Sequence, residues 1–362
     1  MNDTEAPKRP RVRDSRLDIA RGLAIAGVVI VHVYRGLYGA GMVDQSTTYL
    51  VDRLVGFWCL VVFAFVGGTL VPRGVRSRGV SVYVRDRVSR FFAVYVVWAL
   101  LQGSVQLLAA DSVNVPTSPL SIFAVWRPPG QLWYLTFLIL VTAVFVPLRP
   151  WRRGRAPWVL SVAAVISIVF WGYDGGYVGT QGLALVVFFV AGTVCGAERV
   201  LAVLDRFKPA VAGVVGALAL AAVTVLGVLT LATPPTFDPE GRTVMTVAIA
   251  VVVTVVSSAA ILLIGHSLRA VSLLALVGQR SLDIYLAHVI MAAGTRIVLG
   301  QFGVTSLWIY VPAGFLMGMV GSLIAGSVAR RIKLGWVFDG PSWLSRLATA
   351  RYRNRPRSSS PD

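Results

Sequence analysis

The stretch RLDIARGLAIAGVVIVHVYRG, residues 16–36, decides the fold class of this chain. Most of it is Ala, Gly, Ile, Leu and Val, and at roughly 20 residues it is long enough to cross a hydrocarbon core about 30 Å thick. It also carries Asp18, Arg21, His32 and Arg35. The stretch therefore predicts a membrane-spanning helix with polar side chains built into it.

The rest of the chain is just as apolar. Its 362 residues are 56% hydrophobic and 14% charged, whereas an ordinary soluble domain is about 25% charged. Recurring apolar runs predict an all-α, polytopic membrane protein of about ten transmembrane helices. The expected spans are 19–37, 51–71, 91–110, 131–148, 157–172, 181–197, 210–232, 243–265, 281–299 and 306–329.

The formal charge of +18 comes from 34 Lys and Arg residues that gather between spans. They fill the N-terminal tail, the segments 73–90, 151–155 and 198–208, and the last thirty residues, while the alternate loops are nearly devoid of them. This alternation predicts cytoplasmic N- and C-termini and a multi-pass protein of the cell (plasma) membrane. The membrane topology explains why the chain carries so many basic residues, so no nucleic-acid partner is expected.

We expect one membrane domain between two tails. Residues 1–18 form a basic cytoplasmic tail, residues 19–329 form the ten-helix membrane domain, and residues 330–362 form a basic, Pro/Ser-rich tail that we expect to be disordered. Because no soluble domain is visible, any chemistry has to take place in or beside the membrane.

The polar residues of 16–36 form a stripe. At 100° per residue, Asp18, Arg21, His32 and Arg35 fall within an arc of roughly 100°. A charged group facing lipid costs at least about 2.5 kcal/mol, so the stripe is expected to face the bundle interior or a wet cavity. His32, roughly 16 Å deeper than Arg21, is a candidate general base or a helix-packing residue. Arg21 is a candidate phosphate ligand or a topology anchor.

Two further segments carry polar or aromatic candidates. Arg87 and Arg90 lie near the cytoplasmic start of the third span, where they either anchor the helix or bind an anionic cofactor. Trp133 and Tyr134, with Gln131, lie at the outer start of the fourth span. They predict either an interfacial aromatic belt or a sugar-facing platform.

In the ninth span, GQRSLDIYLAHVI places Ser281, Tyr285 and His288 on one helix face, with Asp283 turned away. His288 is a second polar wall of the same cavity or a structural histidine. The sequence contains no Walker-type loop, no HExxH zinc pair and no nucleophile-elbow serine, so no metal is expected.

These motifs resemble those of a known family. RLDIARGLAIAGVVIVH, with ten residues between Arg21 and His32, resembles the hallmark of the acyltransferase 3 family of integral-membrane acyltransferases. FAFVGGTL, RDRVSRFFAVY, QLWYL and GQRSLDIYLAH resemble its later motifs, in the same order. Gly67, Ala93 with Val94, and Gln131 depart from the serine, proline and histidine often found there.

The resemblance implies an acyl-CoA-dependent O-acyltransferase. It would move an acyl group, expected to be acetyl, from cytoplasmic acyl-CoA to a hydroxyl of a carbohydrate or glycosylated acceptor. Arg21, helped by Arg87 and Arg90, would bind the CoA phosphates. His32 would either deprotonate the acceptor or carry the acyl group, and Asp18 would orient Arg21.

The same resemblance implies an acceptor site nearer the outer face. Arg35 and Trp133 would hold the acceptor, with Tyr285 and His288 in the cavity wall. Two other functions also fit the sequence: a transporter or flippase of a polar lipid or glycan precursor, and a membrane N-acetyltransferase of an amino sugar.

Overall fold

The computed structural model describes residues 14–108, 124, 126–173, 175–236 and 242–344. Within these ranges the chain forms helices and turns, with no strand. The all-α prediction is confirmed. The predicted basic N-terminal tail falls partly on residues 1–13, and the predicted disorder of the C-terminal tail falls partly on residues 345–362, all of which lie outside the described residues.

The helices follow one another along the whole chain. They are α1 (Arg16–Gly39), α2 (Gln45–Gly56), α3 (Cys59–Thr69), α4 (Val71–Arg78), α5 (Val80–Leu108), η3 (Gly130–Leu132), α6 (Trp133–Phe145), α7 (Ala156–Val169), η4 (Thr180–Leu185), α8 (Val186–Leu204), α9 (Pro209–Leu229), α10 (Val244–Ser267), α11 (Ser272–Gln279), α12 (Ser281–Gln301), α13 (Leu307–Leu316), η5 (Met317–Gly321), α14 (Ser322–Arg331) and α15 (Trp336–Asp339).

Eight helical segments in the described ranges are long and apolar enough to cross a membrane, as expected for a multi-pass membrane protein. Together with α6 and α7 they match the ten predicted spans. With 13 and 14 residues, α6 and α7 are only about 20 Å long, so each is shorter than the hydrocarbon core.

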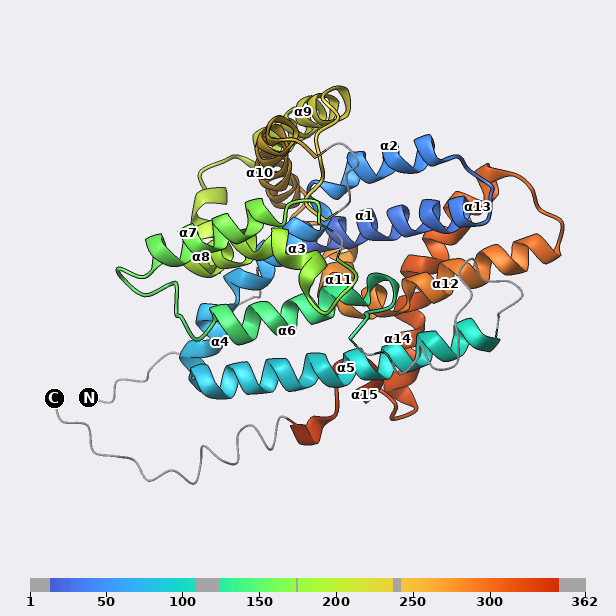
Figure 1. The fold of residues 1–362 in the computed structure, drawn as a ribbon, viewed down its shortest axis with the longest axis horizontal. Coiled ribbons are helices and arrows are strands. Elements are labelled where there is room, and N and C mark those ends of the chain that lie inside the picture. The colour runs from blue at the N-terminus through green and yellow to red at the C-terminus, as the bar shows by residue number, and fades with distance from the viewer. Residues whose placement is uncertain (1–13, 109–123, 125, 174, 237–241, 345–362) are drawn as a thin grey trace, which may run out of the picture.

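Helix α1 lies in the middle of the bundle (Figure 1). It contacts α2, α3, α10, α11, α12 and α13. Ile19, Ala24, Ile25 and Val29 are completely buried along its length. Of its four polar stripe residues, Asp18 is buried and the other three are partly exposed.

Glycines bring α1 unusually close to α11. A Cβ atom added at Gly22 would lie 2.5 Å from the Leu274 carbonyl oxygen, and one added at Gly278 would lie 1.6 Å from that of Asp18. Such small-residue contacts are typical of helix packing in membranes. They fix the position of the N-terminal half of α1, which carries Asp18 and Arg21.

The last span is interrupted beside α12. Pro312 lies inside α13, and η5 is a single π-helical turn between α13 and α14. A Cβ atom at Gly318 would lie 2.7 Å from Val29 of α1 and 3.8 Å from the Cβ atom of His288. The irregular turn thus packs against both helices that carry the histidines, and π turns are frequent at functional sites.

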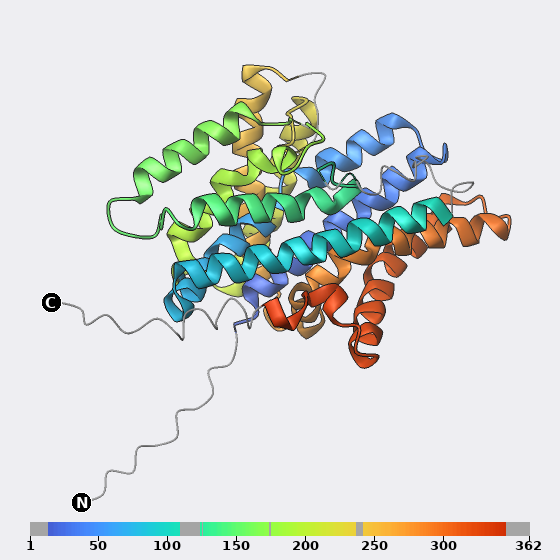
Figure 2. The ribbon, with the colours of Figure 1, turned by 60° about the horizontal axis from the view of Figure 1, so that its bottom comes forward.

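We call the end of the bundle where α1 begins the inner end. Figure 2 shows α5 crossing the bundle lengthwise, with α14 and α15 beneath it. Arg330 of α14 bonds both carboxylate oxygens of Asp283 at 2.7 and 2.8 Å and also binds Asp339 of α15. The predicted boundary between the membrane domain and the C-terminal tail, at residue 330, falls inside α14. The ion pairs of Arg330 also join α15 to α12.

Candidate functional site

Two small cavities lie one beyond the other along α1. The outer pocket, about 50 Å³, is lined by Val28, Val31, His32, Arg35, Asp52, Gly56, Cys59, Leu60, Gln131, Trp133, Tyr134, Gln181, Thr236 and Tyr285. The inner cavity, about 200 Å³, is lined by Arg21, Leu60, Phe63, Gly67, Leu70, Val71, Tyr83, Arg87, Phe91, Tyr134, Leu135, Leu138, Thr142, Phe189, Ser281, Leu282 and Tyr285. Leu60, Tyr134 and Tyr285 line both and form a junction between them.

Two histidines meet at the outer pocket. The rings of His32 and His288 have centroids 4.9 Å apart and are inclined at 68°. Nδ1 of His288 lies 2.9 Å from the carbonyl oxygens of Ile284 and of Tyr285. Carbonyl oxygens only accept hydrogen bonds, so Nδ1 carries the hydrogen and Nε2 keeps its lone pair. Nε2 is buried and has no hydrogen-bond partner among the described residues.

An ion pair forms another wall of the outer pocket. Nη2 of Arg35 lies 3.0 Å from a carboxylate oxygen of Asp52, whose side chain is 4% exposed. Both residues of the pair line the pocket. Such a pair presents donors and acceptors together, which is the arrangement that can orient a polyol.

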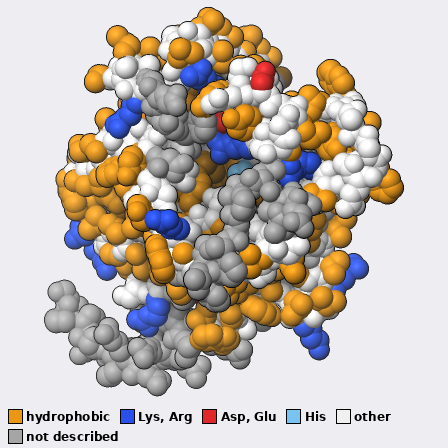
Figure 3. Space-filling model, turned by 45° about the vertical axis from the view of Figure 1, so that its right-hand side comes forward, with side chains coloured by type: hydrophobic (Ala, Val, Ile, Leu, Met, Phe, Trp, Pro, Cys, Tyr) orange, Lys and Arg blue, Asp and Glu red, His pale blue; other side chains and the backbone are white. Residues whose placement is uncertain are grey.

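The outer pocket lies at the end of the bundle opposite the inner end. Figure 3 shows a hollow on this face, with basic side chains and a histidine at its floor. Of the three histidines, His32 is partly exposed, whereas His266 and His288 are buried. The outer pocket is therefore positioned to receive a polar molecule from this side.

The junction between the cavities is built from aromatic side chains. The Tyr134 and Tyr285 rings lie 6.0 Å apart. The Tyr285 hydroxyl donates to the carbonyl oxygen of Gln131, whereas no hydrogen bond within the described ranges occupies the Tyr134 hydroxyl. The Gln131 amide nitrogen is also buried, with no hydrogen-bond partner among the residues that the structure describes. Both groups remain available to a bound molecule.

Arg21 is held in the wall of the inner cavity. Its Nη2 donates to the Ser281 hydroxyl at 2.7 Å, and its Nη1 lies 3.9 Å from Asp18. The guanidinium carbon also lies 6.0 Å from the centre of the Phe63 ring. These contacts fix the cation at the cavity wall, with Asp18 beside it as the sequence suggested.

Arg87 and Arg90 differ in what they contact. Arg87 lines the inner cavity and stacks over Tyr83 and Phe91, at 5.7 and 5.9 Å from the ring centres. Arg90 instead makes a bidentate pair with Asp86 at 2.9 and 2.8 Å, so it does not line the cavity. Its role as a cofactor ligand stays a prediction. The ion pair with Asp86 does not favour that role, because it engages the guanidinium outside the cavity.

The structure brings most of the predicted site residues together. All of the nine except Arg90 line the two cavities or contact a lining residue directly: Asp18, Arg21, His32, Arg35, Arg87, Trp133, Tyr285 and His288. The sequence analysis missed Asp52 and Leu60, and it gave Tyr134 no role at a junction. A lone acidic residue in the apolar stretch before FWCLVVF was the signal for Asp52, whereas nothing in the pattern marks Leu60.

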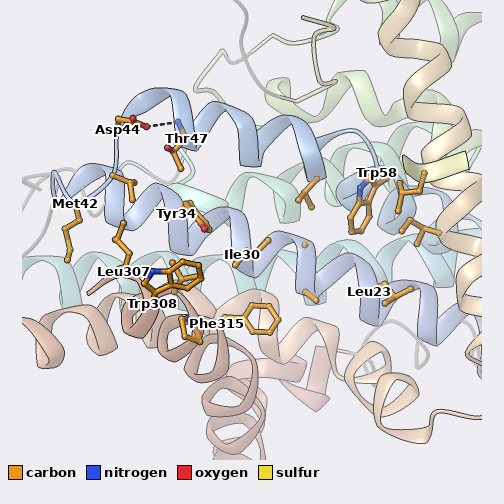
Figure 4. Close-up of a pocket in the computed structure, with 18 of the residues that line it drawn as sticks. Leu23, Ile30, Tyr34, Met42, Asp44, Thr47, Trp58, Leu307, Trp308 and Phe315 are labelled. Atoms are coloured by element: carbon orange, nitrogen blue, oxygen red, sulfur yellow. Dashed lines mark hydrogen bonds between the residues drawn. The ribbon is translucent and has the colours of Figure 1, made fainter. Parts of the chain in front are cut away.

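A larger groove of about 1160 Å³ runs along the other side of α1, between α2 and α13 (Figure 4). Leu23, Ile30, Trp58 and Phe315 lie along it, and it shares no lining residue with the two site cavities. At its outer end Asp44 accepts a hydrogen bond from the Thr47 backbone at 2.7 Å. Hydrogen bonds from the Thr47 side chain and backbone lower the pKa of the Asp44 carboxyl.

The described ranges hold no group of three or more His, Cys, Asp or Glu residues placed to bind a metal ion. Comparison with known proteins gave one finding. A family model described as an acyltransferase domain matches residues 14–326, which cover α1 to η5, the first half of α14 and both cavities. No curated protein and no solved structure matches the chain.

Proposed function

The chain belongs to this acyltransferase family, and from that premise we propose that it transfers an acetyl group from acyl-CoA to a hydroxyl of a carbohydrate or glycosylated acceptor. The observation that carries this proposal is the pair of cavities. One is lined by Arg21 and Arg87 toward the inner end, the other by His32 toward the outer end, and they meet at Tyr134 and Tyr285.

The donor occupies the inner cavity in this proposal. Arg21 and Arg87 bind phosphate oxygens at its mouth, since guanidinium groups pair well with phosphate. Asp18 and Ser281 keep Arg21 in place. The apolar walls formed by Phe63, Leu135 and their neighbours accommodate the arm that carries the thioester toward the junction.

His32 acts as the general base. It accepts the proton of the acceptor hydroxyl while that oxygen forms a bond to the thioester carbonyl carbon. The carbon–sulfur bond then breaks, and the CoA thiolate takes the proton from the imidazolium, so atoms and charges balance. A positioned base of this kind contributes typically about 10² to 10⁴ in rate.

The Tyr134 hydroxyl stabilises the developing negative charge on the carbonyl oxygen. It lines both cavities, and no described residue competes for its proton. A preorganised donor at such a position is worth about 10² to 10³ in kcat. His288 packs behind His32 and offers its Nε2 lone pair as an acceptor there.

The acceptor enters the outer pocket and contacts Arg35, Gln131, Trp133 and Tyr285. The open space beside His32 is small, at about 50 Å³. That room suits the two carbons of an acetyl group, whereas a sugar has to approach from the hollow above. We favour a hydroxyl over an amine because the resemblance points to O-acylation.

The orientation follows from charge. At the inner end, α4 carries Arg73 and Arg76, and the described turns carry Arg152, Arg153, Arg206 and Arg269, whereas the turns at residues 40–44 and 302–306 carry no Lys or Arg. We therefore place the inner end in the cytoplasm, with the chain in the cell membrane. A transporter or flippase is not proposed, because the family is one of acyltransferases.

Binding and turnover of acetyl-CoA by the purified protein test this proposal. His32→Ala is expected to bind acetyl-CoA like wild type and to lose turnover by about 10² or more. Tyr34→Ala is the matched control, because Tyr34 is on the same helix but lines the groove. Absence of acetyl-CoA binding by wild type would overturn the donor assignment.

The same preparation separates two roles for His32. A base in direct transfer requires donor and acceptor together, whereas an acyl-histidine exchanges label between acetyl-CoA and free CoA without acceptor. We expect no such exchange. Exchange at the rate of turnover would show that His32 carries the acyl group.

A further inference from the structure

A basic cavity outside the two site cavities lies at the inner end. It encloses about 310 Å³ and is lined by Pro72, Val75, Arg76, Gly79, Val80, Arg149, Trp151 and Arg152. These residues come from α4, the turn into α5 and the turn between α6 and α7. The lining contains three arginines and no acidic residue.

These three arginines differ from Arg78 and Arg330, which are held in ion pairs at the same end of the bundle. Arg78 binds Asp86, and Arg330 binds Asp283, each with charge-assisted hydrogen bonds. In the part of the chain that the structure describes, no ion pair or hydrogen bond engages the guanidinium groups of Arg76, Arg149 or Arg152. Guanidinium groups gathered around one cavity without carboxylates form a site for an anion, phosphate above all.

The backbone of this turn is unusual as well. Arg149 has φ 52°, in the left-handed region that side-chain-bearing residues seldom adopt. Pro150 is buried directly after it. Such conformations are retained where the surroundings fix them, and they cluster at ligand sites. Here the conformation places Arg149, Trp151 and Arg152 around the same cavity.

Trp151 adds a flat apolar wall. Its side chain is half-buried and packs against the main hydrophobic core, so the indole is held in place. An aromatic plane beside arginines suits a ligand with both a planar base and phosphate groups, because bases stack on indole rings. A volume of about 310 Å³ lies at the lower end of the ligand-pocket range of roughly 300–1000 Å³.

The position of the cavity connects it to the donor site. Pro72 directly follows Val71, which lines the inner cavity. Val80 and Arg87 lie seven residues apart on α5, about 10 Å along the helix axis. The two cavities therefore lie close enough for a single extended ligand to enter both, passing the turn at Gly79 between α4 and α5.

We propose that this basic cavity binds the 3′-phosphoadenosine end of the donor CoA, with Arg149 and Arg152 on the 3′-phosphate and Trp151 against the adenine. The proposal rests on the proposed function, because it names where the far end of that donor binds. Arg21 and Arg87 then contact the diphosphate and the arm.

Binding of CoA and of 3′-dephospho-CoA to the detergent-purified full chain tests the assignment. Wild type is expected to prefer CoA by about 10- to 100-fold, the ratio that charged hydrogen bonds to one phosphate supply. The double variant Arg149→Gln with Arg152→Gln should weaken CoA binding by about that factor and leave 3′-dephospho-CoA binding unchanged. Arg153→Gln is the matched control, because Arg153 is adjacent and exposed but does not line the cavity.

The outcomes separate the two proposals. If wild type binds and turns over acetyl-CoA while the double variant keeps the full preference for CoA, the cavity assignment is wrong and the proposed function stands. If wild type binds neither ligand, the donor assignment fails and this proposal fails with it. An anionic lipid headgroup offers similar chemistry, so thermal stability is also compared in nanodiscs with and without phosphatidylglycerol. A lipid effect that the double variant loses, with no CoA preference in wild type, would assign the cavity to lipid instead.

Discussion

Single side chains at the junction decide what this site can do. Tyr134 and Tyr285 both line the two cavities, but only the Tyr285 hydroxyl is engaged by a described group, the Gln131 carbonyl. A tyrosine whose hydroxyl already donates a hydrogen bond within the protein stabilises the fold. A tyrosine whose hydroxyl makes no such bond can donate to a reacting oxygen. The two tyrosines therefore have different expected roles.

Replacing each tyrosine by phenylalanine separates these roles. Tyr134→Phe is expected to lower kcat for acetyl transfer by about 10² or more with little change in KM, because the lost donor acts in the transition state. Tyr285→Phe should mainly lower thermal stability. Steady-state kinetics and a melting curve of both variants check this, and equal kcat for Tyr134→Phe and wild type would rule out the oxyanion role.

The size of the outer pocket makes a prediction about the donor. Because only about 50 Å³ lies open beside His32, acetyl-CoA is expected to be a much better donor than hexanoyl-CoA. Leu60→Ala, which removes a side chain at the junction, should improve relative use of hexanoyl-CoA by about 10-fold, the scale of a pocket change of a methylene or more. Ile30→Ala, in the groove, is the control that should change nothing. Equal use of both donors by wild type would contradict the size argument.

At the scale of helices, close glycine contacts hold the inner half of the site. Gly22 of α1 packs against the Leu274 carbonyl of α11, and Gly278 packs against the Asp18 carbonyl. Ser281, which accepts the hydrogen bond from Arg21, lies three residues after Gly278 at the start of α12. The geometry of the donor site therefore depends on how closely α1 and α11 approach.

Two glycine variants on the same helix test that dependence. Gly22→Ala places a Cβ atom 2.5 Å from a carbonyl oxygen, so it is expected to lower stability by about 1–3 kcal/mol and to weaken acetyl-CoA binding. Gly36→Ala meets nothing within 4 Å and should be neutral or slightly stabilising, by roughly 0.5–1 kcal/mol. Melting temperatures and binding titrations provide the comparison. Similar melting temperatures for the two variants would show that α1 and α11 can accommodate the added Cβ atom at Gly22 without loss of stability.

The elements also show which features the sequence could predict. Apolar run length is a local property, so the spans were found, and helical periodicity correctly put Asp18, Arg21, His32 and Arg35 on an interior stripe. Partnerships between distant elements leave no local trace. Arg90 and Asp86 are different, because they lie four residues apart on α5 and form a local pair that the sequence could have indicated. The pairing of Arg330 with Asp283 across 47 residues, by contrast, depends on side-chain directions that only the packed bundle sets. The position of Leu60 at the junction of the two cavities likewise depends on how distant helices pack.

For the molecule as a whole, the distribution of charge sets orientation. The proposal puts the turn at Arg153 in the cytoplasm and the turn at Thr305 outside. In a background of Cys59→Ala and Cys195→Ala, Thr305→Cys is expected to react with a membrane-impermeant maleimide in intact cells, and Arg153→Cys only after permeabilisation. Both positions are exposed. Labelling of Arg153→Cys in intact cells would reverse the orientation.

The central claim is that an acyl group passes through the junction from one end of the bundle to the other. The most direct measurement uses proteoliposomes of known orientation, with ¹⁴C-acetyl-CoA on one side and a panel of oligosaccharide acceptors on the other. We expect label in an acceptor only when the donor is on the side of Arg21 and Arg87, and none with His32→Ala. Acetylated acceptor that forms only when donor and acceptor share one side of the membrane would contradict the account.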